Sequence, residues 1–140
     1  MASSIQLERV YPHPPAAVWR ALTDPMVLAA WLMPNDFAPV VGHRFTFRTT
    51  PRPGFDGVVR CEVLVVDEPH HLVYSWQGGP MRQPTEVRWS LTAVPKGTRL
   101  RLEHYGFVGA SGLAVRFVLG LGWRGLLRRE LAAQIARSTS

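Results

Sequence analysis

The sequence predicts an α+β domain in which helices cover one face of an antiparallel sheet. Between residues 44 and 106, apolar and polar side chains alternate in runs separated by short turns, which is typical of strands with one buried face. The stretches on either side have helical start signals and helical spacing. A sheet with one apolar face needs a cover, and 140 residues fit a single domain over 1–140.

The first expected elements are a strand and two short helices. Residues 5–11 alternate between apolar and polar side chains and predict a strand. Three prolines then end it, and because proline is favoured in the first helical turn, a short helix is expected over 16–22. Asp24 can cap a second helix that has Pro25 in its first turn, so that helix is expected over 26–32.

Five more strands are expected after a loop at 35–41. The alternation places them at 44–48, 58–66, 72–76, 85–94 and 98–106. Because strands that follow one another through short turns are antiparallel neighbours, these five are expected to pair in sequence order. In the second of them, the buried face is expected to consist of Val59, Cys61, Val63 and Val65.

Residues 110–138 predict a helical segment that would be about 40 Å long as one helix. In a continuous helix its apolar residues share one side with Arg124 and Arg128, which would bring two arginines to the core. We expect a bend near Gly120 and Gly122 that rephases the helix. The apolar face of the second half then consists of Trp123, Leu127 and Leu131. The alternative is that Arg124 reaches into a cavity and meets an acidic group.

The net charge of the chain and its distribution limit the classes of partner that are expected. The net charge is +6, the isoelectric point is about 10.7, and Lys96 is the only lysine. The arginines are scattered rather than clustered, so no nucleic-acid surface is expected. The basic side of the last helix is expected to be solvated, because its apolar side must cover the sheet and cannot also bind a membrane surface.

No metal, cofactor or membrane span is expected. Cys61 is the only cysteine, which excludes a disulfide and a cysteine-based zinc motif, and His70 and His71 follow a proline in an exposed turn. No nucleophile elbow or phosphate-binding glycine loop occurs. The start of the chain lacks the apolar stretch of a signal peptide, and the longest apolar run, 113–123, is shorter than the roughly 20 residues that span a bilayer. The cytoplasm is the expected location.

Five motifs follow one another along the chain: Pro14-Pro15-x-x-Val18-Trp19-x-x-Leu22-Thr23-Asp24-Pro25, Phe55-Asp56-Gly57, Leu72-Val73-Tyr74-Ser75-Trp76, Gly97-Thr98-x-Leu100-x-Leu102-x-His104-x-Gly106-Phe107 and Gly122-Trp123. In this order they resemble the SRPBCC (START-like) superfamily, and the order of strand, two short helices, five strands and long helix is that of the helix-grip fold. The closest resemblance is to the branch similar to the C-terminal domain of the heat-shock-protein-90 ATPase activator. This resemblance implies a curved six-stranded antiparallel sheet whose long C-terminal helix covers a cavity.

The residues expected to line that cavity follow from strand alternation and from the phase of the last helix. Buried tyrosine and tryptophan need partners for their polar atoms, and an apolar pocket with a few polar groups is the usual form of a ligand site. The leading hypothesis is therefore that the chain binds a small hydrophobic or aromatic molecule. The predicted ligand-binding residues are Phe45, Phe47, Tyr74, Trp76, Trp89, His104, Phe117, Leu121 and Arg124.

Two other functions remain open from the sequence. A polyketide cyclase or dehydratase-like enzyme would use His104 and Tyr74 as acid or base, which requires His104 to be accessible. A structural hydrogen bond is the alternative role for that histidine, and no catalytic residue is assigned. A co-chaperone-like interaction module is the third reading, although the eukaryotic activators carry a further N-terminal domain that is not expected here. A homodimer is compatible with a domain of this kind, but the sequence names no surface for it.

Overall fold

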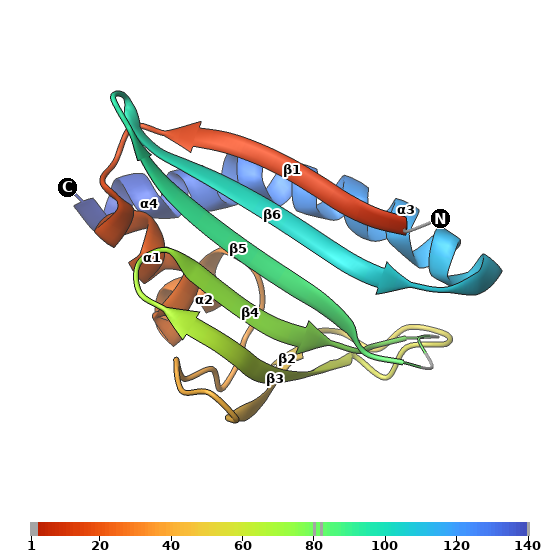
Figure 1. The fold of residues 1–140 in the computed structure, drawn as a ribbon. Helices are drawn as coiled ribbons and strands as arrows, with labels where there is room; N and C mark the ends of the chain where they lie inside the picture. Colours follow the sequence, from red (N-terminus) through yellow and green to blue (C-terminus); the bar gives the residue numbers. More distant parts are fainter. Residues whose placement is uncertain (1–2, 80, 82, 140) are drawn as a thin grey trace.

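The computed structural model describes residues 3–79, 81 and 83–139 of the chain. Six strands and a set of helices form two layers, with the C-terminal helical segment running behind the sheet (Figure 1). The elements in chain order are β1 (Ser3–Tyr11), α1 (Pro15–Thr23), α2 (Pro25–Trp31), β2 (Arg44–Arg48), β3 (Val58–Asp67), β4 (His71–Trp76), β5 (Thr85–Val94), β6 (Gly97–Phe107), α3 (Gly109–Gly125), a π-helical turn η1 (Leu126–Glu130) and α4 (Leu131–Thr139).

The sheet is fully antiparallel, with the strand order β1-β6-β5-β4-β3-β2. The five consecutive strands pair in sequence order as predicted, and β1 joins the sheet beside β6. The curved sheet with two short helices after its first strand confirms the predicted α+β, helix-grip architecture. Helices α1 and α2 contact α4, so they close the end of the domain opposite the N-terminus of α3 (Figure 1).

The two short helices begin as the sequence indicates. The Asp24 carboxylate accepts a hydrogen bond from the Met26 amide at 3.0 Å, and Pro25 occupies the first turn of α2. This cap satisfies an amide that has no partner inside the helix. At the other end of α2, the indole Nε1 of Trp31 donates to the Ala21 carbonyl at 2.8 Å, which joins the two helices.

Strand β3 departs from simple alternation. Val59, Cys61 and Val63 are buried as predicted, but Val65 is 42% exposed and Val66 packs against the core instead. The pairing of β3 with β4 changes register between Val63 and Val65. A bulge adds one residue to one strand and reverses the faces of those after it, so the prediction that Val65 is buried is wrong.

The C-terminal helical segment is rephased at a place other than the predicted one. Helix α3 continues through Gly120 and Gly122 to Gly125, and the irregularity is the π-helical turn η1. Side chains four apart in an α-helix drift by about 40° per step, and the extra residue of a π turn cancels much of that drift. The turn therefore keeps one buried line on the sheet side, consisting of Trp123, Leu127, Leu131 and Ile135.

Candidate functional site

The aromatic side chains predicted to line a cavity fill the space between the sheet and the C-terminal helix. Phe45, Phe47, Tyr74, Trp76 and Trp89 are each no more than 3% exposed. Their rings contact one another edge-on or tilted, with centroids 5.3 Å apart for Phe45 and Tyr74 and 5.4 Å apart for Phe47 and Trp76. These are favourable packing geometries for aromatic rings. The middle of the domain is consequently a packed aromatic core.

Tyr74 and Trp89 satisfy each other's polar atoms within this core. The indole Nε1 of Trp89 donates to the Tyr74 hydroxyl at 3.0 Å. Burial raises the pKa of the Tyr74 phenol, because the ionised form would lose its hydration. The phenol is therefore neutral at ordinary pH, and neither ring has an exposed edge.

His104 is the centre of a buried hydrogen-bond chain. The indole Nε1 of Trp123 donates to His104 Nδ1 at 3.1 Å, which places the proton of the neutral ring on Nε2. That Nε2–H can donate to Thr85 Oγ1 at 2.7 Å, and the Thr85 hydroxyl donates to the Trp76 carbonyl at 2.7 Å. Every polar atom of the imidazole thus has a partner.

An acid–base role would require His104 to be accessible to a substrate, and its burial excludes that. The side chain is fully buried, and desolvation lowers its pKa from 6.5 to about 3. A neutral imidazole with both nitrogens bonded to protein side chains has no position open for a substrate. The structural alternative for His104 is the one that its geometry supports.

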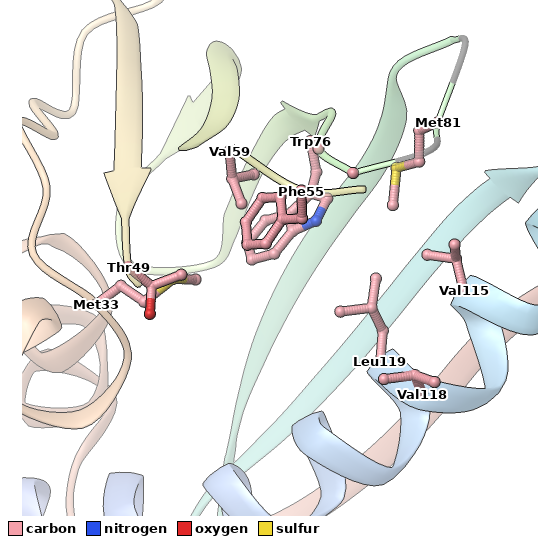
Figure 2. Close-up of a pocket in the computed structure, with 11 residues that line it drawn as sticks. Met33, Thr49, Phe55, Val59, Trp76, Met81, Val115, Val118 and Leu119 are labelled. Carbon is pink, nitrogen blue, oxygen red and sulfur yellow. The ribbon is translucent and has the colours of Figure 1, made fainter. Parts of the chain in front are cut away.

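A pocket of about 280 Å³ lies beside this core, at the end of the sheet where β3 begins and β4 ends. Its walls include the loop between β2 and β3, the loop between β4 and β5, and residues 115–119 in the middle of α3 (Figure 2). Trp76 is the predicted site residue that lines it. The lining consists of Met33, Thr49, Phe55, Val59, Trp76, Gly78, Gly79, Met81, Val115, Val118 and Leu119.

Two polar side-chain groups face this otherwise apolar pocket. The indole Nε1 of Trp76 makes no hydrogen bond among the described residues and is not a buried unsatisfied atom, so a molecule in the pocket can reach it. Figure 2 shows this nitrogen at the ring edge, with the hydroxyl of Thr49 on another wall. Among the described residues, the lining contains no Asp, Glu, His, Lys, Arg, Cys or Tyr. These described residues can therefore donate one or two hydrogen bonds to a ligand, and none of them titrates near neutral pH.

The loop that carries Phe55 is held by a position that only glycine can occupy. Gly57 has a positive φ of 82°, and a Cβ there would lie 2.4 Å from the Thr49 carbonyl oxygen. Thr49 N–H donates to the Gly57 carbonyl at 2.8 Å, and Asp56 accepts from the Val58 amide at 3.1 Å. The Phe55-Asp56-Gly57 motif, which in the sequence indicates only a family resemblance, thus positions a pocket wall.

Helix α3 presents a different face to the sheet from the predicted one. Val115 and Leu119 are half-buried over the pocket, whereas Phe117 and Leu121 are 67% and 59% exposed. Two residues correspond to about 200° of rotation, so the two pairs lie on nearly opposite sides. The prediction that Phe117 and Leu121 face the cavity is wrong.

Arg124 is exposed on the outer side of the C-terminal helix, next to β1. It does not line the pocket at the end of the sheet.

Among the described residues, no three His, Cys, Asp or Glu side chains come close enough to hold a metal ion. Within the same residues, no helix has the length and the apolar character needed to cross a membrane.

Comparison with solved structures gives the same architecture. Protein MLL2253 from Mesorhizobium loti is 34% identical, with a TM-score of 0.84 over 96% of this chain and 98% of that one. Protein BH1534 from Bacillus halodurans is 26% identical, with a TM-score of 0.79 over 96% and 99% of the two chains. CalU16 from Micromonospora echinospora is 25% identical, with a TM-score of 0.77 over 99% of this chain and 79% of that one. No curated protein matches the chain.

Together, the sheet, the two short helices and the long C-terminal helical segment define an SRPBCC, or START-like, domain. A family model matches residues 12–136. The chain belongs to the family described as Activator of Hsp90 ATPase homolog 1-like protein.

Proposed function

We propose that the chain binds a small, uncharged apolar molecule that carries one hydrogen-bond acceptor, in the pocket between the end of the sheet and α3. The supporting observation is the lining, in which the Trp76 indole N–H and the Thr49 hydroxyl are the only polar side-chain groups that the described residues contribute. Burying a charge without a partner is strongly unfavourable, so a charged ligand is disfavoured. A carbonyl or ether oxygen is the group that can accept from the Trp76 N–H.

The size of the pocket limits the ligand. A cavity of about 150 Å³ holds benzene, so 280 Å³ accommodates a molecule of roughly two rings. The flat indole of Trp76 and the flexible thioethers of Met33 and Met81 suit planar apolar ligands of varied outline. Val118 is 66% exposed at the rim, so a longer molecule can extend into solvent.

The test is a pair of substitutions on adjacent residues of α3. Val118→Trp places an indole at the rim of the pocket, while Phe117→Trp adds the same side chain to the exposed side of the helix. We expect Val118→Trp to weaken binding of the uncharged probe prodan, a two-ring aromatic ketone, by about tenfold or more, because the larger side chain occupies part of the pocket and reduces the area that the probe can bury there. Phe117→Trp should leave the dissociation constant within about twofold. Titration of probe fluorescence measures both.

Two results would contradict this proposal. One is that the wild-type chain shows no saturable binding of the probe. The other is that the two variants bind equally well, which would place the probe elsewhere on the molecule.

The enzyme alternative lacks a supporting group in the pocket. His104 and Tyr74 are buried and bonded to other side chains, and no residue in the described part of the lining titrates near neutral pH. The co-chaperone-like alternative has no specific observation in its favour among the described residues, and we do not propose it. The sequence predicted ligand contacts for four further core aromatic residues, namely Phe45, Phe47, Tyr74 and Trp89. We propose instead that these side chains lie behind the pocket wall and hold Trp76 in place by packing.

A further inference from the structure

A second concave surface lies on the outer side of the C-terminal helix. This groove, which we call the β1–α3 groove, has a volume of about 370 Å³. Residues 4–7 of β1 form one wall, and the other wall includes Arg116, Phe117, Leu121 and Arg124 of α3. It is separate from the apolar pocket, because the two share no lining residue.

One wall of the groove is an open sheet edge. Strand β1 is the first strand in the sheet order and pairs only with β6. Among the described residues, no backbone hydrogen bond of residues 4–10 joins them to anything beyond the sheet. A strand edge with free N–H and C=O groups can pair with another extended chain. Gly120 leaves the opposite wall without a side chain where α3 passes β1, since a Cβ there would contact only Ile5 at 3.8 Å.

The charge of the groove is positive and uncompensated. Arg116 and Arg124 line it and form no ion pair in the described part of the chain. Arg116 Nε is a buried donor without a hydrogen-bond partner, and no other described side chain leaves a buried N or O atom in that state. Arg9 adds a third guanidinium in the adjoining hollow, which Arg124 also lines. An unpaired buried donor is costly, so these groups favour an acceptor of opposite charge.

The carboxylate of Glu8, which lines the adjoining hollow, does not neutralise these arginines. Glu8 forms ion pairs with Arg99 at 3.2 Å and with Arg101 at 3.6 Å. A second copy of this chain would bring another set of groove arginines to the same edge, and like charges brought together are repulsive. Charge complementarity thus favours a partner richer in acidic residues than this chain is.

We propose that an extended acidic peptide segment of a partner protein binds in the β1–α3 groove as an additional strand along β1. Its backbone would pair with the free edge of β1. Alternate carboxylates would reach Arg116 and Arg124, and apolar side chains would cover the exposed Phe117 and Leu121. Such strand addition draws its affinity from main-chain hydrogen bonds and its specificity from alternate side chains.

The test uses peptides of about ten residues that alternate threonine and glutamate, labelled for fluorescence anisotropy. Two matched peptides accompany the first: one has lysine in place of glutamate, and one keeps the glutamates but has N-methylated backbone amides. We expect the glutamate peptide to bind, the lysine peptide not to bind, and N-methylation to weaken binding by about tenfold, because it removes pairing donors. Equal affinity of the N-methylated peptide would overturn strand addition.

The protein variants test the location. The double variant Arg116→Gln/Arg124→Gln should bind the glutamate peptide about tenfold or more weakly than the wild type does, since each substitution removes a charge-assisted hydrogen bond. The control is Arg48→Gln on β2, the opposite edge of the sheet, with an expected change of about twofold or less. An equal loss from the control would show general charge attraction and overturn the assignment.

Two further measurements keep the proposal testable if the double variant folds poorly. In the wild-type chain, the peptide should shift the backbone amide NMR signals of residues 4–10, and shifts confined to β2 would overturn the proposal. Sedimentation of the unliganded chain tests the rival occupant. A dimer of the wild-type chain whose formation shifts the amide signals of residues 4–10 would mean that a second copy, rather than an acidic peptide, occupies the groove.

Discussion

At the scale of single residues, a substitution at Tyr74 tests whether its side chain stabilises the core or contacts the ligand. Its hydroxyl accepts the hydrogen bond of Trp89 Nε1 inside the core. Tyr74→Phe would leave that buried N–H unpaired and should lower the free energy of unfolding by about 1–3 kcal/mol. Because Tyr74 does not line the pocket, binding of the apolar probe should not change. Urea unfolding and probe titration test the two parts separately, and weaker binding in the variant would place Tyr74 in the site.

His104 makes the stability of the domain depend on pH. Its pKa is about 3 in the folded chain and 6.5 when exposed, so between these values the unfolded chain binds a proton that the folded chain does not. This group therefore lowers stability as the pH falls through 6.5 toward 3. From pH 7 to pH 5 the contribution is about 2 kcal/mol.

The variant His104→Gln tests this prediction, and His71→Gln is its control because His71 is exposed at the start of β4. Between pH 7 and pH 5 the free energy of unfolding should decrease in both chains, and the decrease should be about 2 kcal/mol smaller in His104→Gln than in the wild type. His71→Gln should follow the wild type. Parallel pH profiles for all three chains would mean that His104 is protonated at the same pH in the folded and unfolded states.

At the scale of elements, the π turn explains why the C-terminal helical segment could not be phased from the sequence alone. Both Val115-Leu119 and Phe117-Leu121 are apolar pairs at helical spacing. The larger side chains favour the second pair, whereas the structure buries the first. The prediction placed the correction at two glycines, because glycine is unfavourable in a helix, yet α3 passes through them without interruption. A π turn has no comparably clear sequence signal.

A pair of deletions tests the role of the π turn. Removing Arg129, an exposed residue of η1, should convert it to a regular α turn and keep both halves in phase, with a loss of about 1 kcal/mol or less. Removing the exposed Leu121 from regular α3 should instead rotate Val115 and Leu119 by about 100° relative to the sheet and abolish probe binding. Circular dichroism, urea unfolding and probe titration measure the outcome. Equal damage from both deletions would contradict the phase argument.

At the scale of the whole molecule, the fold was predictable and the pocket was not. Strand alternation and short turns act locally, so the sheet and its pairing follow from the sequence, with the bulge before Val65 as the exception. The aromatic residues of those strands were correctly placed inside. The pocket, in contrast, depends on the loops around Phe55 and Met81, which have no periodic pattern. Whether aromatic rings enclose a void or fill it depends on packing distances that alternation does not determine.

The pocket leaves the two halves of the C-terminal helical segment unequally supported. From Trp123 to Ile135 the buried line rests on the core, but Val115 and Leu119 face a hollow, and Leu113, Phe117, Val118 and Leu121 are exposed. Local opening is cheapest where few apolar contacts must be broken. We therefore expect amide hydrogens of residues 113–119 to exchange with deuterium faster than those of residues 123–135, and an occupied pocket to slow the first set selectively. Uniform exchange along the segment would mean that the hollow has no energetic consequence.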